Sequence, residues 1–404
     1  MNIKLNDNVI FVSGAYNAAI YDFNRNKIFS VNKESKEFLL RYIQGEQAKT
    51  TEEKAYLLFL RQNGLLGNTN IFPEYNPQPN TENILNFVWL EVTQACNLRC
   101  RHCYEGSTHI SQINRLSVDK WKKVITELAE CGCKNIQFIG GEPACFPDII
   151  QLLDFAKKYE FCSIGFFTNA TMISNALLMC FIRNNINVIV SLYGATADIH
   201  DCITQVAGSF EKTVNNIKRM LTTGISVTVS ITLMRENEDF YEQTVRFVKD
   251  LGVKKIKYDL VRKTDGSCKE CGLVSRMHLI ADKYRLKPKF TISKEKFDNA
   301  AWQNTCWYGK FAITENGDVL PCVFERNIIY GNVLETSIKD LLNSEKLSMY
   351  WNYDLSKVEE CKDCEFRYAC KDCRPLGILN GGIKRKNSRC LYSPLTGEWK
   401  EFKE

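Results

Sequence analysis

The chain has 404 residues, which corresponds to two or three domains at about 150 residues per domain. Hydrophobic residues make up 45% and charged residues 25%, and this balance excludes a largely disordered chain. The net charge of +6 is spread over the whole length and does not indicate a nucleic-acid-binding surface. No apolar run reaches the roughly 18 residues that a membrane span needs, so we expect neither nucleic acid nor membrane as a partner.

The unusual feature of the composition is its 18 cysteines. A disulfide scaffold is typically shorter and richer in cysteine than this chain. The chain begins MNIKLNDNVIF, without a secretory signal pattern, and we expect a reducing cytoplasm in which clustered cysteines bind metal or carry out redox chemistry. Six cysteines stand apart from any cluster and are expected to pack as small hydrophobic side chains: Cys131, Cys133, Cys145, Cys162, Cys180 and Cys202.

Residues 1–72 are predicted to form a small unit in which strands are followed by helices. Residues 8–23 and 27–32 alternate well enough to indicate strands, with a polar turn between them. A helix is expected from Ser35 to about Gly45, and a second one over residues 50–67 with Gly64 as its stop. This order indicates a winged-helix-like module, and the proline-rich stretch 73–83 is the expected linker.

From residue 84 onward, short apolar strands alternate with amphipathic helices. Strands are expected over residues 86–93, 135–140, 163–169, 187–194, 226–233 and 255–261. Helices are expected over residues 117–132, 146–159, 174–184, 209–224 and 240–252. This alternation predicts an α/β fold with a parallel sheet. Residues 84–262 are too few for a full barrel of eight units, so we expect a partial (β/α)6 TIM-type barrel with its active site at the carboxyl ends of the strands.

The βα repeat stops after residue 262. We expect a bridging region over residues 263–305 and a loop-rich, cysteine-rich domain over residues 306–404. Residues 311–322 indicate a hairpin with Asn316 and Gly317 at its turn. Because the rest of this domain lacks the apolar periodicity of a conventional core, metal is expected to hold it together.

Three cysteines follow the first barrel strand as a C-x3-C-x2-C motif: Cys96, Cys100 and Cys103. Three thiolates are one too few for a closed zinc or cubane site. A [4Fe–4S] cluster held by three cysteines keeps one iron open for an external ligand. A zinc site completed by His102 is the alternative, but His102 lies between two of the ligands, where its reach is poor.

This motif, at this place in a partial barrel, resembles the radical S-adenosylmethionine (SAM) superfamily. The resemblance implies that the open iron chelates SAM, which is cleaved by one electron to a 5′-deoxyadenosyl radical that abstracts hydrogen from a substrate. It also implies that a set of residues at the strand ends contacts SAM: Tyr104, Gly140, Gly141, Glu142, Pro143, Thr168, Asn169, Ser191 and Leu260. Independently, glycines at 140 and 141 allow backbone to approach a ligand closely, and Glu142 can pair with an ammonium group. Some relatives carry a SAM-contacting arginine near Thr204, where this chain has none.

The cysteine-rich domain carries further cysteines at zinc-like spacing, and one or two structural zinc sites would explain them in isolation. Together with the first motif, they resemble the SPASM extension of radical SAM enzymes, which carries two auxiliary [4Fe–4S] clusters. The resemblance implies a distal cluster held by Cys361, Cys364, Cys370 and Cys390, and a nearer cluster held by Cys306, Cys322 and Cys373. The spacing before Cys373 is x2, where the usual pattern has x3. Cys268 and Cys271 form a C-x2-C that either completes the nearer cluster or is a surface pair.

Residues 1–72 resemble the RiPP recognition element, which implies that they bind the leader of a ribosomally made precursor peptide as an added strand. The chain is thus identified as a radical SAM/SPASM peptide maturase with SAM, three [4Fe–4S] clusters and an electron donor of the flavodoxin or ferredoxin type. The expected product is an intramolecular cross-link, a thioether first and a C–C cyclophane-type bond next. A sulfatase-maturing-type or other protein-oxidising radical SAM enzyme is the alternative within the family. A non-catalytic, zinc-stapled peptide-binding scaffold is the alternative from another class.

Overall fold

The computed structural model describes residues 2–78, 85–104, 106, 116–262, 272–275 and 291–400. The chain divides into two compact units. The terminal unit contains Met1–Glu82, Tyr284–Tyr308 and Met349–Glu404, and the barrel unit contains Asn83–Lys283 and Gly309–Ser348. The cysteine-rich stretch expected from the sequence is therefore shared between both units.

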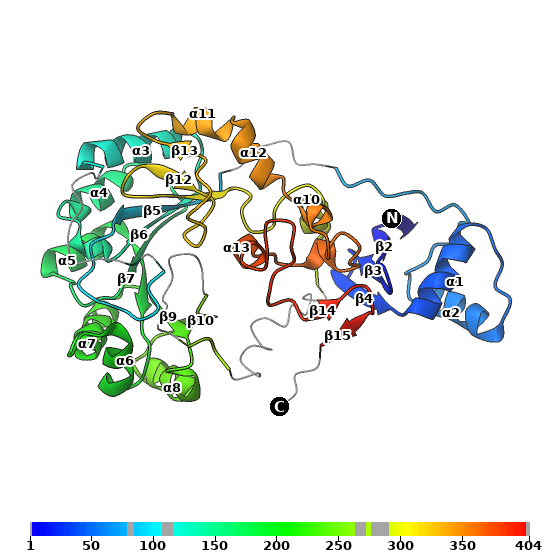
Figure 1. Cartoon of the computed structure of the whole chain (residues 1–404), viewed down its shortest axis with the longest axis horizontal. Coiled ribbons are helices and arrows are strands. Elements are labelled where there is room, and N and C mark those ends of the chain that lie inside the picture. The colour runs from blue at the N-terminus through cyan, green and yellow to red at the C-terminus, as the bar shows by residue number, and fades with distance from the viewer. Residues whose placement is uncertain are drawn as a thin grey trace. The chain divides into compact units, whose positions relative to one another are not determined.

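The barrel unit is built on a nine-stranded sheet in the order β10-β9-β8-β7-β6-β5-β11-β12-β13 (Figure 1). The strands from β5 to β10 run parallel to their neighbours. They are β5 (Phe87–Thr93), β6 (Asn135–Gly140), β7 (Ser163–Thr168), β8 (Asn187–Ser191), β9 (Val227–Leu233) and β10 (Lys255–Leu260). All six strands expected from the sequence are confirmed. Among the described strands the sheet ends at β10 and β13 and does not close, which is the partial barrel that the sequence predicts.

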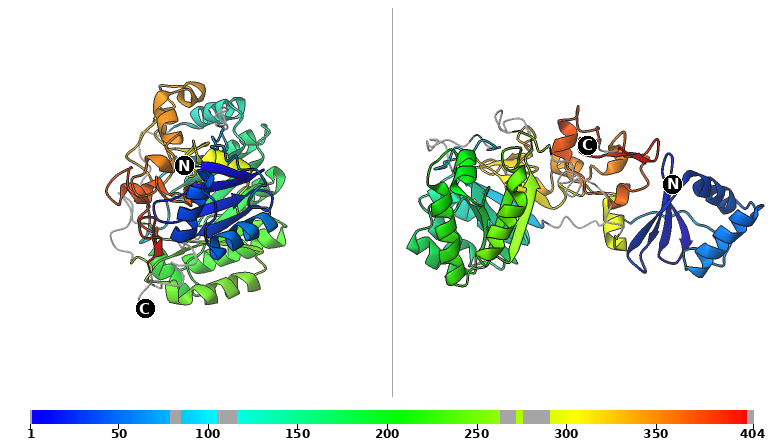
Figure 2. Two further views of the ribbon diagram at one scale, coloured as in Figure 1. Left: turned by 90° about the vertical axis from the view of Figure 1, so that its right-hand side faces the viewer. Right: turned by 90° about the horizontal axis from the view of Figure 1, so that it is seen from below.

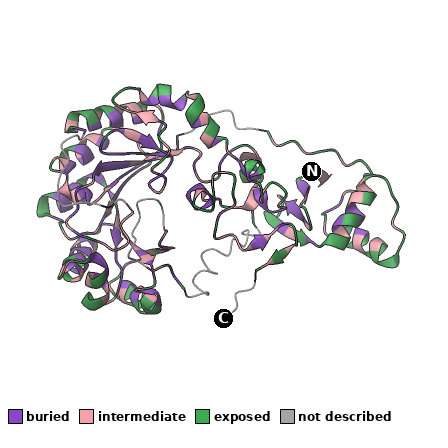
Figure 3. Ribbon diagram, in the orientation of Figure 1, coloured by how far each residue is buried: buried purple, intermediate pink, exposed green. Residues whose placement is uncertain are grey.

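Helices cover the outer face of this sheet (Figure 1). They are α3 (Val118–Glu130), α4 (Ile149–Ala156), α5 (Asn175–Asn184), α6 (Ala197–Thr204), α7 (Ser209–Thr222) and α8 (Tyr241–Asp250), with short 3-10 turns η1 (Pro143–Cys145) and η2 (Glu238–Phe240). In α3, residues spaced as one helical stripe are buried against the sheet, and the Ser117 side chain caps the first turn. Figure 3 shows the resulting buried inner stripe and exposed outer stripe of the helices. The sequence predicts every one of these helices except α6.

The two sides of the barrel strands carry different side chains. In β9, every second residue is a buried aliphatic side chain: Val227, Val229, Ile231 and Leu233. The residues between them are Thr228, Ser230 and Thr232, and the last two line a cavity. Because successive strand residues point to opposite faces, the aliphatic set packs under the helices and the polar set faces the barrel interior. The interior therefore remains open enough to hold a ligand.

A C-terminal hairpin extends the barrel sheet beside β5. Strand β11 (Lys310–Ile313) pairs in parallel with β5, and β12 (Asp318–Leu320) pairs antiparallel with β11 and with β13 (Gly331–Asn332). Gly317 has a φ of +89° in the turn, a conformation that favours glycine, so the predicted hairpin is confirmed. Its docking on the barrel was not expected. Helix α11 (Ile338–Leu342) follows, and the backbone N–H of Ile338 donates to Glu127 of α3.

The terminal unit begins with a four-stranded antiparallel sheet in the order β1-β2-β3-β4. Its strands are β1 (Asn2–Asn6), β2 (Val9–Ser13), β3 (Ala18–Asp22) and β4 (Lys27–Val31), followed by α1 (Lys33–Ile43) and α2 (Thr51–Gln62). Asn32 caps α1, and Thr50 with Glu53 forms a capping box on α2. The order of strands followed by helices agrees with the sequence, which had not indicated β1.

Both faces of this small sheet are covered. Helices α1 and α2 pack on one face (Figure 2, right), over a core that includes Phe11 and Leu39. On the other face, five sheet residues share a core with four residues from late in the chain: Ile10, Val12, Ala19, Tyr21 and Ile28 with Ile292, Phe297, Phe366 and Tyr392. Burial on both faces explains why all five residues of β3 are buried.

Short elements carry this C-terminal part of the terminal unit. They are α10 (Lys294–Ala300), the end of α12 (Glu345–Trp351), η3 (Leu355–Lys357), η4 (Arg367–Ala369), α13 (Arg374–Ile378), β14 (Tyr392–Ser393) and β15 (Glu398–Trp399). The turn between β2 and β3 docks on them, because Ala15 N–H donates to the Asp363 carbonyl at 2.7 Å and Tyr16 N–H donates to the Pro394 carbonyl at 3.1 Å. Residues 1–72 therefore have one core of their own, under α1 and α2, and a second core that they share with the C-terminal segments.

The close packing between the end of β6 and the end of β5 can be tested by substituting Gly140. Gly140 has a φ of +149°, and a Cβ there would lie 2.1 Å from the carbonyl oxygen of Thr93. We expect Gly140→Ala to lower the free energy of unfolding by about 3 kcal/mol, because neither strand end can move away without breaking the sheet. Gly132→Ala is the matched control, since Gly132 also has a positive φ but no atom within 4 Å of the added Cβ, and we expect about 1 kcal/mol. Chemical denaturation of the cluster-free chain measures both, and equal losses would contradict the steric argument.

A second prediction concerns His200, whose side chain is buried and whose Nδ1 accepts from the Tyr193 N–H at 3.2 Å. Burial lowers the pKa of His200 from 6.5 to about 4. The unfolded chain therefore binds this proton more readily, and stability is lost as the pH falls below 6.5 toward 4. We expect His200→Asn, which keeps an acceptor, to reduce the loss of unfolding free energy between pH 7 and pH 5 by about 2 kcal/mol. An unchanged pH dependence in urea titrations would refute this assignment.

Candidate active site

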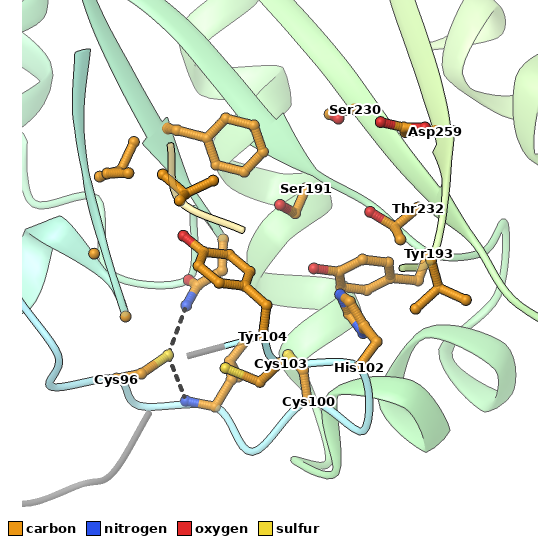
Figure 4. A pocket seen from close by; sticks show the side chains of 18 of the residues that line it. Cys96, Cys100, His102, Cys103, Tyr104, Ser191, Tyr193, Ser230, Thr232 and Asp259 are labelled. Carbon is orange, nitrogen blue, oxygen red and sulfur yellow. Dashed lines mark hydrogen bonds between the residues drawn. The ribbon is translucent and has the colours of Figure 1, made fainter. Parts of the chain in front are cut away.

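A cavity of about 790 Å³ lies at the carboxyl ends of the barrel strands (Figure 4). Ten of the residues singled out in the sequence line it: Cys96, Cys100, Cys103, Tyr104, Gly140, Gly141, Thr168, Asn169, Ser191 and Leu260. The structure thus brings together residues from five strand ends that are up to 164 positions apart in the chain (96 to 260). Glu142 and Pro143 do not line the cavity, because both are buried in the turn behind it.

The loop with the three cysteines is held from two sides. On one side, the N–H groups of Arg99 and Arg101 donate to the carbonyls of Thr204 and Ile203 at 3.0 and 2.9 Å. On the other side, the Asn169 side chain and the Leu98 N–H donate to the sulfur of Cys96, at 3.9 and 3.4 Å (Figure 4). Thr204 itself is fully buried, so the position where some relatives carry arginine supports the loop from behind.

The three thiols are a suitable donor set for an iron–sulfur cluster. They come from one loop and lie together beside Tyr104 at the cavity (Figure 4). Burial raises the pKa of the Cys96 thiol to about 12, and burial with the neighbouring Cys96 and Cys103 also raises the pKa of Cys100. Thiolates here need a nearby positive charge, which a metal cluster supplies.

His102, the ligand in the zinc alternative, packs its ring against Tyr193 at 4.6 Å between centroids. Burial lowers its pKa to about 4, and its Nδ1 has no hydrogen-bond partner among the described residues. Within the same residues, no three His, Cys, Asp or Glu side chains are grouped as ligands of a single metal ion.

Glu142 organises the neighbouring turns instead of facing the cavity. It is fully buried, and its carboxylate accepts hydrogen bonds from the Thr168 hydroxyl at 2.7 Å and from the N–H groups of Asn169 and Ala144 at 2.7 and 3.1 Å. Burial raises the pKa of Glu142 to about 7, although these donors favour the charged form. A direct contact of Glu142 with SAM stays a prediction.

The two glycines before Glu142 serve close packing of the chain itself. A Cβ on Gly141 would lie 2.4 Å from the Gln94 carbonyl oxygen, and the Gly141 N–H donates to the Thr93 carbonyl at 2.8 Å. The two glycines therefore admit the neighbouring strand end, and because both also line the cavity, their approach to a ligand stays a prediction. This brings the turn after β6 against the start of the cysteine loop.

The cavity has an aromatic side and a polar side. Trp89, Phe167 and Phe324 are on the aromatic side, where the Phe324 ring lies 5.3 Å from that of Tyr104. The polar side comes from β8 to β10 and contains Ser191, Ser230, Thr232 and Asp259 (Figure 4). Strand register places these in line, since Ser191 pairs with Ser230 and Thr232 pairs with Asp259.

Most of these wall residues were missed in the sequence. Those missed are Trp89, Gln137, Phe167, Tyr193, Ser230, Thr232, Asp259, Arg262, Val323 and Phe324. The sequence signal that could have found the strand residues is the alternation within the strands. Every second residue is not aliphatic, and these are the residues that face the barrel interior. Val323 and Phe324 follow the C-terminal hairpin, and no local pattern indicated their place in the barrel.

The structure gathers four of the C-terminal cysteines in the terminal unit: Cys361, Cys364, Cys370 and Cys390. Burial raises the pKa of Cys361 to about 12, with Cys390 as its next cause. Burial also raises the pKa of Cys370, with Cys390, Cys361 and Cys364 among the neighbours that add to the shift. These are the four cysteines that the resemblance assigns to the distal cluster, and their ligation stays a prediction.

The nearer set is divided between the units. Cys306 and Cys373 belong to the terminal unit and Cys322 belongs to the barrel unit, while Cys268 and Cys271 lie outside the described residues.

Of the cysteines expected to pack, Cys133 and Cys180 are buried, and Cys131 and Cys145 are half-buried. Cys162 and Cys202 are exposed, so the expectation was wrong for them; both lie at positions where the helix or loop faces solvent. No helix among the described residues is long and apolar enough to cross a membrane.

Comparison with known proteins agrees with this geometry. Residues 90–248 match the radical SAM superfamily, and residues 306–365 match an iron-sulfur cluster-binding domain named SPASM. The antilisterial bacteriocin subtilosin biosynthesis protein AlbA of Bacillus subtilis is 27% identical over 317 residues, which cover 74% of this chain and 69% of AlbA. The PqqA peptide cyclase of Bradyrhizobium diazoefficiens is 25% identical over 349 residues, 76% of this chain and 86% of the cyclase.

Solved structures show the same fold. Streptococcus suis SuiB superposes with a TM-score of 0.63 over 96% of this chain and 99% of SuiB, at 15% identity. The enzyme anSMEcpe with bound AdoMet superposes with a TM-score of 0.56 over 77% of this chain and 93% of anSMEcpe, at 16% identity. The chain therefore belongs to the radical SAM superfamily, as a radical SAM enzyme that carries a SPASM domain and has peptide maturases among its relatives.

Proposed function

We propose that this enzyme cross-links a ribosomally made precursor peptide whose leader binds to the terminal unit. The observation that carries the proposal is the cavity itself, where three thiols of one loop face a chamber with one aromatic and one polar wall. The names of the relatives support a peptide substrate, since one is a peptide cyclase and SuiB has been solved bound to precursor peptide SuiA.

Cys96, Cys100 and Cys103 would hold a [4Fe–4S] cluster, which together with SAM supplies one-electron cleavage to a carbon radical. The chain's own residues prepare the place where this chemistry occurs. The aromatic wall around Trp89 and Phe324 offers an apolar surface to a ligand on one side of the chamber, and the hydroxyls of Ser230 and Thr232 offer hydrogen bonds on the other side. A reactive radical needs enclosure, because any open path to solvent allows side reactions.

The free edge of the small sheet is the proposed leader site. Both faces of that sheet are covered, so only its edges can accept a peptide. The edge at β1 is occupied, because Lys4 N–H donates to the Pro73 carbonyl at 2.9 Å and Tyr75 N–H donates to the Asn2 carbonyl at 2.8 Å. At the opposite edge, β4 pairs with no described strand besides β3, and Phe29, which packs against the core under α1 and α2, is only half-buried. An extended leader can therefore add beside β4 as a fifth strand.

We further propose two auxiliary [4Fe–4S] clusters, the distal one on the four gathered cysteines of the terminal unit. The nearer set has three cysteines among the described residues, which leaves one position for a substrate thiolate and favours a thioether product. A full set of protein ligands there favours a C–C cyclophane-type bond instead. The electron enters from a donor of the flavodoxin or ferredoxin type.

Two observations argue against the two alternative functions. The structural match to anSMEcpe covers 77% of this chain, whereas the match to SuiB covers 96%. The alternative of a sulfatase-maturing-type enzyme therefore leaves more of this chain without a structural counterpart. Membership in the radical SAM superfamily argues against a non-catalytic, zinc-stapled scaffold.

The cluster assignment predicts the effect of removing one thiol. After anaerobic reconstitution, we expect about twelve irons per wild-type chain, on four irons for each of three clusters. Cys100→Ala should lose about four of these and should release no 5′-deoxyadenosine from SAM, because two thiols cannot retain the cluster. Cys162→Ala removes an exposed cysteine outside the cavity and should behave as wild type. Iron analysis and chromatography of the nucleoside products measure both, and sustained release from Cys100→Ala would overturn the assignment.

The leader site predicts a separation between peptide binding and SAM cleavage. We expect Phe29→Glu to weaken the affinity for the precursor peptide encoded beside this chain about tenfold, because a charge replaces the apolar contact at the β4 edge. SAM cleavage without peptide should be unchanged. Leu58→Glu is the matched control, since Leu58 is exposed on α2 and lies outside β4. Fluorescence anisotropy of the labelled peptide measures both, and equal affinities for Phe29→Glu and wild type would reject the docking role.

A point substitution is needed because deleting residues 1–72 would also strip the core that they share with Phe297 and Phe366.

A further inference from the structure

A buried ion pair joins the first barrel strand to the segment that follows the C-terminal hairpin. Glu91 lies in β5 two residues after Trp89, so both side chains face the barrel interior. Glu91 is 0% exposed. A single nitrogen of Arg326, Nη1, lies 2.7 and 2.8 Å from its two carboxylate oxygens.

Separating Glu91 from Arg326 would cost a large free energy. A carboxylate removed from water needs a partner of opposite charge, and a guanidinium is the strongest such donor among side chains. If Arg326 moved away, Glu91 would stay buried without this countercharge. The position of Arg326 is therefore tied to a strand whose own place is set by two neighbouring strands.

The segment Cys322–Arg326 is compact between this pair and the hairpin. Glu325 N–H donates to the Cys322 carbonyl at 3.2 Å, and the Glu325 side chain accepts from Asn327 N–H at 3.0 Å. Cys322 is only 7% exposed. A turn of this kind moves as one piece when its end is released.

The same segment forms part of the cavity wall. Val323 and Phe324 line the cavity, and the guanidinium of Arg262 lies 4.5 Å above the Phe324 ring. One residue before them is Cys322, the predicted ligand of the nearer auxiliary cluster. The wall of the reaction chamber and that ligand are thus adjacent residues of one short turn.

A second buried carboxylate ties the hairpin to the cysteine loop. Glu315, at the end of β11, accepts from the Gln94 N–H at 2.7 Å, two residues before Cys96. Glu315 is 1% exposed, and its carbonyl accepts from Leu116 N–H at 2.9 Å. The hairpin is therefore fixed independently of Arg326, and loss of the Glu91–Arg326 pair should release only the turn.

We infer that Glu91 and Arg326 form a latch that positions the Cys322–Arg326 turn as the common wall of the chamber and of the nearer auxiliary-cluster site. The latch sets the separation between a substrate in the chamber and the cluster that Cys322 is predicted to hold. Arg326 and Glu91 are positioning residues in this role. The cluster part rests on the proposed function, whereas the latch itself is a property of the chain.

The test follows the accessibility of the Cys322 thiol in the full-length chain before cluster reconstitution. The chain is pulsed with iodoacetamide under reducing conditions, and alkylation of each cysteine is quantified by peptide mass spectrometry. Cys180, 0% exposed, reports global unfolding, and the exposed Cys162 reports reagent activity. We expect Arg326→Met to raise the alkylation rate of Cys322 at least tenfold while Cys180 stays protected. An unchanged rate at Cys322 would overturn the latch.

Two further variants distinguish the loss of the ion pair from the effect of a buried carboxylate that has lost its countercharge. In Glu91→Met with Arg326→Met, no buried charge is left alone, yet the tie is gone, so Cys322 should remain as reactive as in the single variant. Restored protection in this double variant would overturn the latch and assign the effect to the buried Glu91 carboxylate that had lost its Arg326 countercharge. If Arg326→Met also exposes Cys180, the single variant is globally unfolded. The alkylation rate of Cys322 in the double variant then decides whether the latch holds. Arg183→Met, which breaks the solvent-exposed pair with Asp154, is the control and should leave Cys322 protected.

Reconstitution then separates this inference from the proposed function. We expect Arg326→Met to lose about four irons, those of the nearer cluster, and to retain the irons of the other two clusters. If wild type itself binds no cluster at Cys322 but the alkylation results hold, the latch stands and the auxiliary-cluster assignment fails.

Discussion

The position of β5 is the constraint on which the rest of the barrel unit depends. The strand pairs with β6 along nearly its whole length, in the register Phe87 to Asn135, and its first four residues pair with β11 in the register Phe87 to Lys310 (Figure 1). It leads directly into the cysteine loop, so any shift of β5 would move the three thiols. The close approach of Gly140 and Gly141 exists because the end of β6 must pass against this same strand end. The C-terminal hairpin is thus part of the barrel sheet, and the cysteine loop and the hairpin share one hydrogen-bonded scaffold.

Local patterns were sufficient for the elements of the barrel and for the cysteine loop. Each of the first five strands has a helix of clear amphipathic spacing between it and the next strand, so period and length together distinguish strand from helix. The capping residues Ser117, Thr50 and Asn32 sit where a helix start needs a side-chain acceptor. The ten predicted residues at the strand ends converge on one cavity because the carboxyl ends of parallel strands meet at one edge of the sheet.

Pairings between distant segments were beyond these patterns. Nothing in residues 310–313 indicates that they lie beside β5, since a short apolar run has no preferred partner until the sheet exists. Residues 1–72 were expected to form a small unit, yet the partners of Ile10 and Tyr21 lie near the other end of the chain. The sequence indicated Glu142 as a possible partner of an ammonium group but not its hydrogen bonds from Thr168 and Asn169, which come from the next strand end. The partners of these side chains are therefore set by tertiary packing, which the periodicity of the sequence does not reveal.

The shared core of the terminal unit determines the order in which the protein can mature on the ribosome. Ile28 packs in one cluster with Ile292 and Tyr392, so 264 to 364 further residues must be made before the second face of the small sheet is covered (292 − 28 and 392 − 28). At about 5 to 20 residues per second, that face waits for tens of seconds with its apolar side chains in water. The barrel unit, which can begin with near-sequential βαβ pairings, emerges in between. The first domain to leave the ribosome is accordingly the last to be completed, and its folding is coupled to the arrival of the C-terminal cysteines.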